Sequence, residues 1–145
     1  MSSDLSGVIR VLAVVAAGHD RICLRRMFQG FRWRGEFVQS CDKLELALES
    51  FQPDVVLTDS ALADGESWRD VLRTAQERRE APPVIVTSRL ADDRLWAEVL
   101  NLGGYDLLVS PYQESEVLHV VNMAWRTRQN GQSAAAAAGE GRFVA

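Results

Sequence analysis

The side chains best suited to chemistry stand at the ends of apolar runs in this 145-residue sequence. They are the carboxylate of Asp59 and the hydroxyl groups of Thr87 and Ser110, while the first apolar run ends at Ala16 and Ala17. A carboxylate is a ligand for Mg²⁺, which demands near-octahedral oxygen coordination and usually takes one or two carboxylates. Because these positions offer only Asp59 and a backbone carbonyl, we expect magnesium binding to be weak or absent, and no other cofactor.

Asp20 and Asp64 are the other acidic residues near these positions, and an ordinary structural role is favoured for each. Asp20 stands just beyond the first run and is expected to cap the helix that follows, a position that Asp favours. Asp64 precedes a glycine and is expected in a turn. His19 with Asp20 resembles the paired ligands of metal phosphohydrolases, but His119 falls within an expected helix, so a metal site has little support.

Alternating strands and helices must position these residues. Short β-branched runs that do not alternate with polar residues are typical of strands covered on both faces. Between the runs, apolar residues recur at the helical spacing of three and four. The expected strands are 8–15, 36–40, 55–59, 84–87 and 107–109, the second being assigned from its place between two helices. The expected helices are 21–31, 44–51, 68–79, 92–102 and 114–128.

Five such units predict an α/β fold of the flavodoxin-like (CheY-like) type. Right-handed crossovers favour a doubly wound, five-stranded parallel sheet in the order 2-1-3-4-5 with helices on both faces. The functional crevice of such a sheet lies at the carboxyl ends of its central strands, so Asp59, Thr87 and Ser110 are expected to share one pocket. Residues 1–128 form the expected domain, and residues 129–145, with five consecutive alanines, form an expected flexible tail.

Three segments of the chain resemble the receiver domains of two-component response regulators. Residues 53–59 resemble the third strand of that family, which ends in its phosphoacceptor aspartate, here Asp59. Thr87 matches the hydroxyl residue that closes the fourth strand, and residues 103–112 are similar to the fifth-strand signature. The resemblance covers residues 8 to about 126. Three motifs in the right order, with spacers of helix length, are far more specific together than any one alone.

The resemblance implies a phosphorylation chemistry that this chain retains only in part. Receivers hold Mg²⁺ with an acidic pair after the first strand and use a lysine after the fifth, because a transferring phosphoryl group needs compensating positive charge. Ala16 and Ala17 stand at the positions of the acidic pair, and Ser110 stands at that of the lysine. Leu107 replaces the usual aromatic relay residue. The chain therefore resembles a degenerate, stand-alone receiver, a signalling module rather than an enzyme.

Composition and charge exclude several other classes of function. A net charge of −4 and a pI near 5.2 argue against direct nucleic-acid binding. Cys23 and Cys41 form neither a disulfide framework nor a zinc pattern, and are expected to be reduced thiols of a cytoplasmic protein. No stretch reaches the roughly 18 apolar residues of a membrane span. No glycine-rich nucleotide-binding loop occurs.

Two groups of residues suggest protein partners, and for both a purely structural role stays open. An arginine cluster in and after the first helix is either a solvated surface or a docking site for an acidic partner. In receivers the equivalent helix meets the histidine-bearing phosphodonor. Trp96 and Trp125 belong to a face that receivers use for dimers and partners, or else they pack on their own sheet. The arginines are Arg21, Arg25, Arg26, Arg32 and Arg34.

Three functional hypotheses follow. The first is a degenerate receiver that acts through protein contacts, with a histidine kinase or an output protein as partner and a homodimer as a further option. The second is a receiver that is still phosphorylated on Asp59 in a rearranged site. The third is a flavodoxin-like domain that binds a small molecule in the emptied crevice. We favour them in that order.

Overall fold

The computed structural model describes residues 8–90 and 92–133. The strands are β1 (Arg10–Val14), β2 (Arg34–Val38), β3 (Val55–Asp59), β4 (Val84–Ser88) and β5 (Asp106–Val109). The helices are α2 (Gly18–Phe31), α3 (Leu44–Phe51), α4 (Trp68–Gln76), α5 (Asp93–Asn101) and α6 (Glu114–Ser133). Two short 3₁₀ turns, η1 (Cys41–Lys43) and η2 (Ala63–Gly65), precede α3 and α4.

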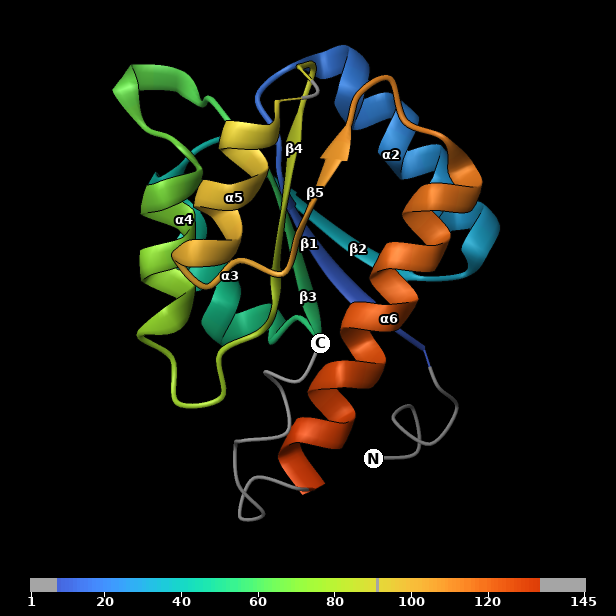
Figure 1. Cartoon of the computed structure of the whole chain (residues 1–145). Coiled ribbons are helices and arrows are strands. Elements are labelled where there is room, and N and C mark those ends of the chain that lie inside the picture. The colour runs from blue at the N-terminus through green and yellow to red at the C-terminus, as the bar shows by residue number, and fades with distance from the viewer. Residues whose placement is uncertain (1–7, 91, 134–145) are drawn as a thin grey trace.

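The strands form one parallel sheet in the order β2-β1-β3-β4-β5, which confirms the predicted fold. The chain passes from β1 outward to β2 and then returns across β1 to β3, so the order of the strands reverses between β1 and β3. The carboxyl ends of the strands point to the upper edge of the molecule in Figure 1. In doubly wound sheets the crevice beside this reversal point is where functional side chains gather.

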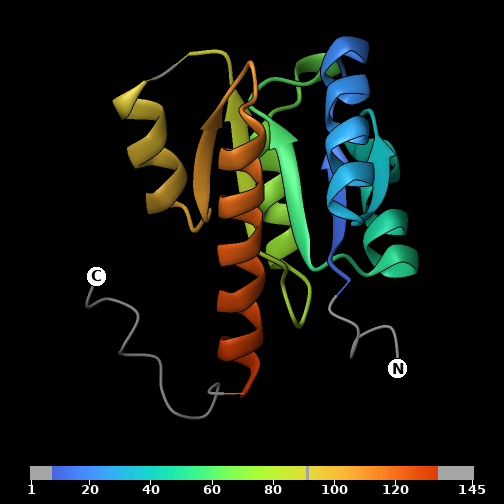
Figure 2. The ribbon, with the colours of Figure 1, turned by 90° about the vertical axis from the view of Figure 1, so that its right-hand side faces the viewer.

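Helices cover both faces of the sheet, as Figures 1 and 2 show. Alternate residues of a strand point to opposite faces, so a strand covered on both sides is apolar throughout. In β1, Val11 and Ala13 pack toward α2 and α6, whereas Leu12 and Val14 pack toward α3 and α4. The five-residue apolar runs therefore fill two cores at once, and polar side chains are left to the strand ends.

Strand β2 lies two residues earlier than expected, at Arg34–Val38. The reason is the close approach of this edge strand to α2. A Cβ atom at Gly35 would lie 2.7 Å from the Phe28 ring, which only glycine avoids without a shift. The Phe28 and Phe37 rings stack with centroids 5.5 Å apart. Aromatic packing on one face thus decides the register that the weak apolar pattern of this segment left open.

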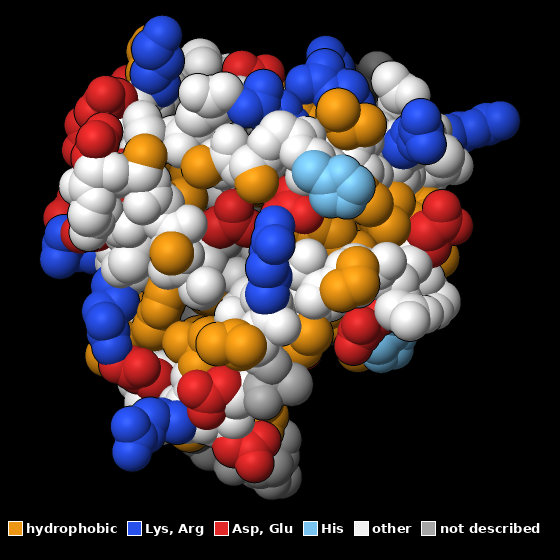
Figure 3. Space-filling model, turned by 90° about the horizontal axis from the view of Figure 1, so that it is seen from above, with side chains coloured by type: hydrophobic (Ala, Val, Ile, Leu, Met, Phe, Trp, Pro, Cys, Tyr) orange, Lys and Arg blue, Asp and Glu red, His pale blue; other side chains and the backbone are white. Residues whose placement is uncertain are grey.

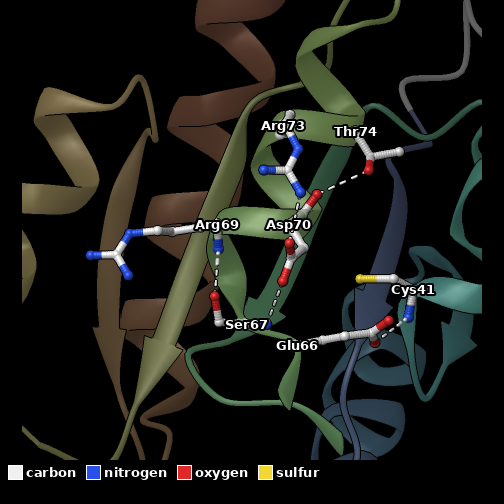
Figure 4. A network of polar contacts seen from close by, with 7 residues as sticks. All are labelled: Cys41, Glu66, Ser67, Arg69, Asp70, Arg73 and Thr74. Carbon is white, nitrogen blue, oxygen red and sulfur yellow. Dashed lines mark hydrogen bonds and ion pairs between the residues drawn. The ribbon is translucent and has the colours of Figure 1, made fainter. Parts of the chain in front are cut away.

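The start of α4 is held by a capping box, drawn in Figure 4. The Ser67 hydroxyl accepts a hydrogen bond from the Arg69 N–H at 3.2 Å, and the Asp70 carboxylate accepts one from the Ser67 N–H at 2.9 Å. Asp70 also forms a 2.7 Å ion pair with Arg73. Such a box satisfies N–H groups that the first turn of a helix leaves unpaired. It fixes where α4 begins, directly after the loop that follows Asp59.

Glu66 links this loop to the turn before α3, through a hydrogen bond that its carboxylate accepts from the Cys41 N–H at 3.0 Å (Figure 4). Burial, helped by the Glu66 charge, raises the pKa of the Cys41 thiol to about 11. The thiol is therefore protonated at neutral pH, and a protonated thiol is a poor nucleophile. Cys23 and Cys41 are both free, as predicted.

The helix boundaries that differ most from those expected are the start of α2 and the ends of α4 and α6, and α4 ends at Gln76 rather than at residue 79. Asp20 does not cap α2, since the helix begins at Gly18 with Ala17 as its N-cap, and Asp20 lies buried in the first turn. The last helix, α6, continues to Ser133, past the predicted end of the domain at residue 128. Residues 134–145 of the expected tail lie outside the described residues. Within the part of the chain that the structure describes, none of the helices has the length and apolar composition needed to cross a bilayer.

Candidate functional site

Asp59 and Thr87 form the centre of the site. Asp59 is the last residue of β3 and Thr87 the last but one of the neighbouring strand β4, and the register places them directly opposite each other. The Thr87 hydroxyl donates a hydrogen bond to Asp59 Oδ1 at 2.9 Å. Thr87 is buried, whereas Asp59 is part-buried and reaches the pocket. The strand ends thus present a carboxylate whose orientation is fixed by a buried hydroxyl.

Ser110 completes the expected trio, at the end of β5. It lines the same pocket as Asp59 and Thr87, a cavity of ≈ 340 Å³ at the carboxyl edge of the sheet. The predicted convergence of the three side chains is confirmed. Ala16 and Ala17, which follow β1, also line this pocket, and the Ala16 backbone donates a hydrogen bond to the Asp59 carboxylate that lowers its pKa. The other lining residues are Asp20, Ser60, Ala61, Ser88, Arg89 and Leu90.

Asp20 and Arg89 bring opposite charges into this pocket, and the sequence analysis assigned neither of them to it. The Asp20 carboxylate lies 3.9 Å from the Arg89 guanidinium, and the residue is only 7% exposed. Arg89, by contrast, has a side chain that is 71% exposed, so the pair is long and screened by water. Seen from above, acidic and basic side chains lie next to each other near the centre of this face, with a histidine close by (Figure 3).

A hydrogen-bond chain extends from Asp59 through Thr87 to Tyr112. The Tyr112 hydroxyl donates a hydrogen bond to Thr87 Oγ1 at 3.4 Å, and the Thr87 hydroxyl donates one to Asp59 Oδ1. A threonine hydroxyl has one proton and two lone pairs, so it can accept from Tyr112 while donating to Asp59. Burial raises the pKa of Tyr112, which keeps the phenol protonated and able to donate. Leu107 lies elsewhere and packs with the core on the α3–α5 side.

A second hollow adjoins the first around the loop after β5. It measures ≈ 400 Å³, and its lining includes His19, Cys23 and Tyr112 together with Asp20 and Arg89. His19 and Asp20 thus do lie at the site. Within residues 8–90 and 92–133, however, no three His, Cys, Asp or Glu side chains come together in a way that could hold a metal ion. Asp64 is exposed and has a left-handed backbone conformation in η2, consistent with the predicted turn.

The ionisation of Asp59 is less favourable in the folded protein than in the unfolded chain. Burial raises the pKa of Asp59 more than the hydrogen bond from Thr87 lowers it, and the Asp20 carboxylate adds to the rise. A carboxyl group with a higher pKa in the folded state than in the unfolded state binds its proton more tightly when folded. The charge of Asp59 therefore lowers the free energy of unfolding when the pH is above this pKa. The free energy of unfolding rises again as the pH falls through it.

We expect Asp59→Asn to raise the melting temperature at pH 7 by a few degrees. The neutral amide removes the cost of a part-buried charge, and its oxygen still accepts the bond from Thr87. The gain should shrink as the pH falls from 7 to 3, because Asp59 of the wild type then becomes neutral. Thermal melts across this range test the expectation, with Asp64→Asn as an exposed control. An unchanged or lower melting temperature at pH 7 would contradict it.

The two tryptophans of the predicted interface occupy different environments. Trp125 is part-buried and packs against the core between the sheet and α2 and α6. Trp96, on α5, is 47% exposed, and its indole N–H donates a hydrogen bond to Asp106 Oδ1 at 3.2 Å. Further exposed apolar side chains lie on α5 or close to it in the sequence. These are Leu90, Leu100 and Leu102.

No protein-family model and no curated protein sequence matches the chain. Solved structures do match, and several receiver domains are among them. A signal receiver domain from Vibrio parahaemolyticus is 18% identical, with a TM-score of 0.78 over 86% of this chain and 95% of that one. A CheY-like receiver from Methanospirillum hungatei is 15% identical, with a TM-score of 0.74 over 85% and 98%.

A third similar structure is the receiver domain of a sensor histidine kinase from Pseudomonas aeruginosa, which has a magnesium ion coordinated in its active-site cleft. It is 19% identical, with a TM-score of 0.69 over 81% of this chain and 98% of that chain. At such low identities the likenesses establish the CheY-like fold of this chain, while its chemistry has to be argued from its own residues.

Proposed function

We propose that this protein is a receiver domain of two-component signalling that acts through protein contacts, with an impaired magnesium-dependent phosphoryl switch. The observation that carries the proposal is the composition of the pocket. Asp59 and Thr87 are hydrogen-bonded at the strand ends where receivers keep their phosphoacceptor and hydroxyl residue. Around them, Ala16, Ala17 and Ser110 stand where receivers keep the acidic pair and the lysine.

The oxygen donors of the pocket do not fit a bound Mg²⁺ ion. Magnesium needs hard oxygen ligands in a near-octahedral arrangement. Ala16 and Ala17 line the pocket but have no side-chain oxygen to offer a metal ion. Asp20 adds a second carboxylate, but the guanidinium of Arg89 already lies beside it at 3.9 Å. A divalent cation entering here would have to displace or approach a positive charge that the protein itself supplies.

Protein partners are the alternative way to set the state of such a domain. Solved receivers of the same fold include parts of a sensor histidine kinase and of a response regulator protein with sensory box and GGDEF domains. For this chain we propose a histidine kinase or an output protein in the cytoplasm as the partner. The exposed indole of Trp96 supports a protein-binding surface on α5, because large aromatics often carry the binding energy of interfaces.

The Asp59–Thr87 bond also favours a second candidate, a receiver that is still phosphorylated on Asp59 in a rearranged site. Its positive charge would come from Arg89, the basic residue that lines the pocket. This candidate differs from the first in one measurable respect. It requires phosphorylation of Asp59 at a useful rate, whereas the first requires none.

A magnesium titration tests the proposed loss of the metal site. We expect no saturable heat in calorimetry when the wild type is titrated with millimolar Mg²⁺. Ala16→Asp/Ala17→Asp should gain saturable binding, because it adds two carboxylates to the lining of the pocket. The double variant shows that the assay can detect a restored site. Saturable binding to the wild type that is lost in Asp59→Asn would overturn this part of the proposal.

Association of the protein through the surface around Trp96 is a separate prediction. We expect sedimentation velocity to show reversible self-association in the micromolar range, weakened at least several-fold by Trp96→Ala. The side chain is 47% exposed, so truncation removes contact area with a partner while leaving the core intact. Ile22→Ala, an exposed apolar change on α2, is the matched control. If wild type and Trp96→Ala give the same monomer at all concentrations, self-association through this surface is excluded.

A further inference from the structure

A second charged pocket lies at the opposite edge of the sheet from Asp59. Gln52 and Pro53 precede β3 and Pro82 precedes β4, so the pocket is at the amino ends of the strands, toward the lower edge in Figure 1. It is a cavity of ≈ 250 Å³ where the end of α3, the segment between α4 and β4, and the last turns of α6 meet. Its remaining lining residues are Leu48, Arg78, Arg79, Glu80 and Arg128.

Arg128 is a fixed part of this pocket. Its Nη1 donates to Asp54 Oδ1 at 3.1 Å, and its Nη2 donates to the Glu80 carbonyl oxygen at 3.2 Å. Asp54 in turn accepts a hydrogen bond from the backbone N–H of Arg10 at 2.9 Å. Through Asp54, Arg128 is therefore linked to the first residue of β1. The Arg128 side chain is only 16% exposed, and its Nε–H is buried without a hydrogen-bond partner among the described residues. A buried donor without an acceptor is uncommon in native proteins.

Arg78 and Arg79 bring two more guanidinium groups to the same pocket. Asp54 already pairs with Arg128, and Glu80 lines the pocket, so three guanidinium groups meet two carboxylates. The balance is still positive, although the chain as a whole carries a charge of −4. A guanidinium presents a planar fork of N–H donors that matches the oxygens of phosphate, and several such forks favour a multiply charged anion. Leu48, Pro53 and Pro82 form apolar walls around the charged groups.

We propose that this pocket binds a compact phosphorylated small molecule, with its phosphate oxygens held by Arg78, Arg79 and Arg128. The volume supports a small ligand, because ≈ 250 Å³ lies just below the roughly 300–1,000 Å³ usual for pockets that hold drug-sized molecules. The inference does not depend on the proposed receiver function, since it concerns the far edge of the sheet. Bound anion would join α3, the loop before β4 and α6, and so stabilise the fold.

The test uses pyrophosphate as the probe, in calorimetry and thermal melts at constant ionic strength. We expect saturable binding and a rise of several degrees in melting temperature, both absent with added chloride. Citrate, an anion of similar charge without phosphorus, should bind at least tenfold more weakly. In Arg78→Gln/Arg79→Gln the affinity for pyrophosphate should fall at least tenfold. Arg128 is left unchanged because its bonds to Asp54 and Glu80 also hold α6 in place.

Two control variants decide between this pocket and other basic sites. Arg94→Gln removes an exposed arginine of α5 and should leave the affinity for pyrophosphate within twofold of the wild type. Arg89→Gln removes the arginine of the Asp59 pocket and should do the same. Loss of binding in Arg89→Gln alone, equal affinity for citrate, equal affinity in Arg78→Gln/Arg79→Gln, or no binding to the wild type would each overturn the proposal.

Discussion

Incubation of the protein with a small-molecule phosphodonor and magnesium is expected to leave its intact mass unchanged, in conditions that fully label an ordinary receiver. The three phosphoryl oxygens and the Asp59 carboxylate would meet in a pocket where Ala16, Ala17 and Ser110 supply no charge. Arg89 is the one basic side chain among the residues that line the pocket, and it is largely exposed and lies beside Asp20.

The expected effect is large because two sources of positive charge are affected at once. Removing a single preorganised donor to the developing charge costs on the order of 3 kcal/mol, or roughly a hundredfold in rate. Losing both the metal and the lysine would therefore slow phosphorylation by roughly 10⁴-fold if the two effects add. The raised pKa of Asp59 does not compensate, since a part-buried carboxylate gains basicity without gaining a partner for the transferred group.

Intact-mass spectrometry over a time course measures this directly, with Asp59→Asn as the control for labelling at other residues. Ala16→Asp/Ala17→Asp/Ser110→Lys should acquire the phosphoryl mass, which shows that the donor is active and that the missing groups limit the wild type. An added phosphoryl mass on the wild type that disappears in Asp59→Asn would favour the phosphorylated receiver instead.

The largest expected effect on stability comes from Trp68→Ala. Trp68 is 3% exposed at the start of α4 and packs in the core between the sheet and α3 and α4. Truncating a buried aromatic to alanine costs about 3–5 kcal/mol, from lost burial and from the cavity that remains. Domains have only about 5–15 kcal/mol of stability, so we expect a large fall in the unfolding midpoint.

Trp96→Ala is the matched control, because it is the same substitution at a side chain that is half exposed. Its cost should be about 1 kcal/mol or less, from the lost contact area and the hydrogen bond to Asp106. Urea unfolding followed by circular dichroism gives both values. Equal losses of stability in the two variants would contradict the assignment of Trp68 to the core and of Trp96 to the surface.

The fold could be predicted from the sequence because strands buried on both faces are unbroken apolar runs. Val55–Asp59 and Val84–Ser88 illustrate this, since each run ends where a polar side chain begins, and those ends carry the site. The convergence of Asp59, Thr87 and Ser110 followed from topology alone, because parallel strands place their carboxyl ends at one edge. No side-chain detail was needed for that step.

The residues that the sequence analysis missed reach the pocket from loops and from a helix. Asp is a residue type that often caps helices, which led to the expectation for Asp20. Because α2 begins at Gly18, Asp20 instead lies in the first turn and lines the pocket with Asp59. Arg89 follows β4, and its guanidinium comes near Asp20 because of the conformation of its long side chain, which the strand does not determine. Tyr112 lies just past the fifth-strand motif, and only the course of the loop brings its hydroxyl to Thr87. Periodicity carries no information on such loop paths.

The bonds around Thr87 also give its hydroxyl proton a choice of acceptor. Thr87 Oγ1 lies 2.9 Å from Asp59 Oδ1 and 3.4 Å from the carbonyl oxygen of Thr58, and it accepts from Tyr112. When Asp59 gains a proton, or loses its charge in any other way, the threonine hydrogen can rotate to the carbonyl while every heavy atom stays in place. The O–H bond of Thr87 then points away from Asp59, while the bond from Tyr112 to Thr87 keeps its direction. A change of charge at Asp59 thus alters the electrostatic environment of the Tyr112 hydroxyl, in the loop after β5, through one hydrogen atom.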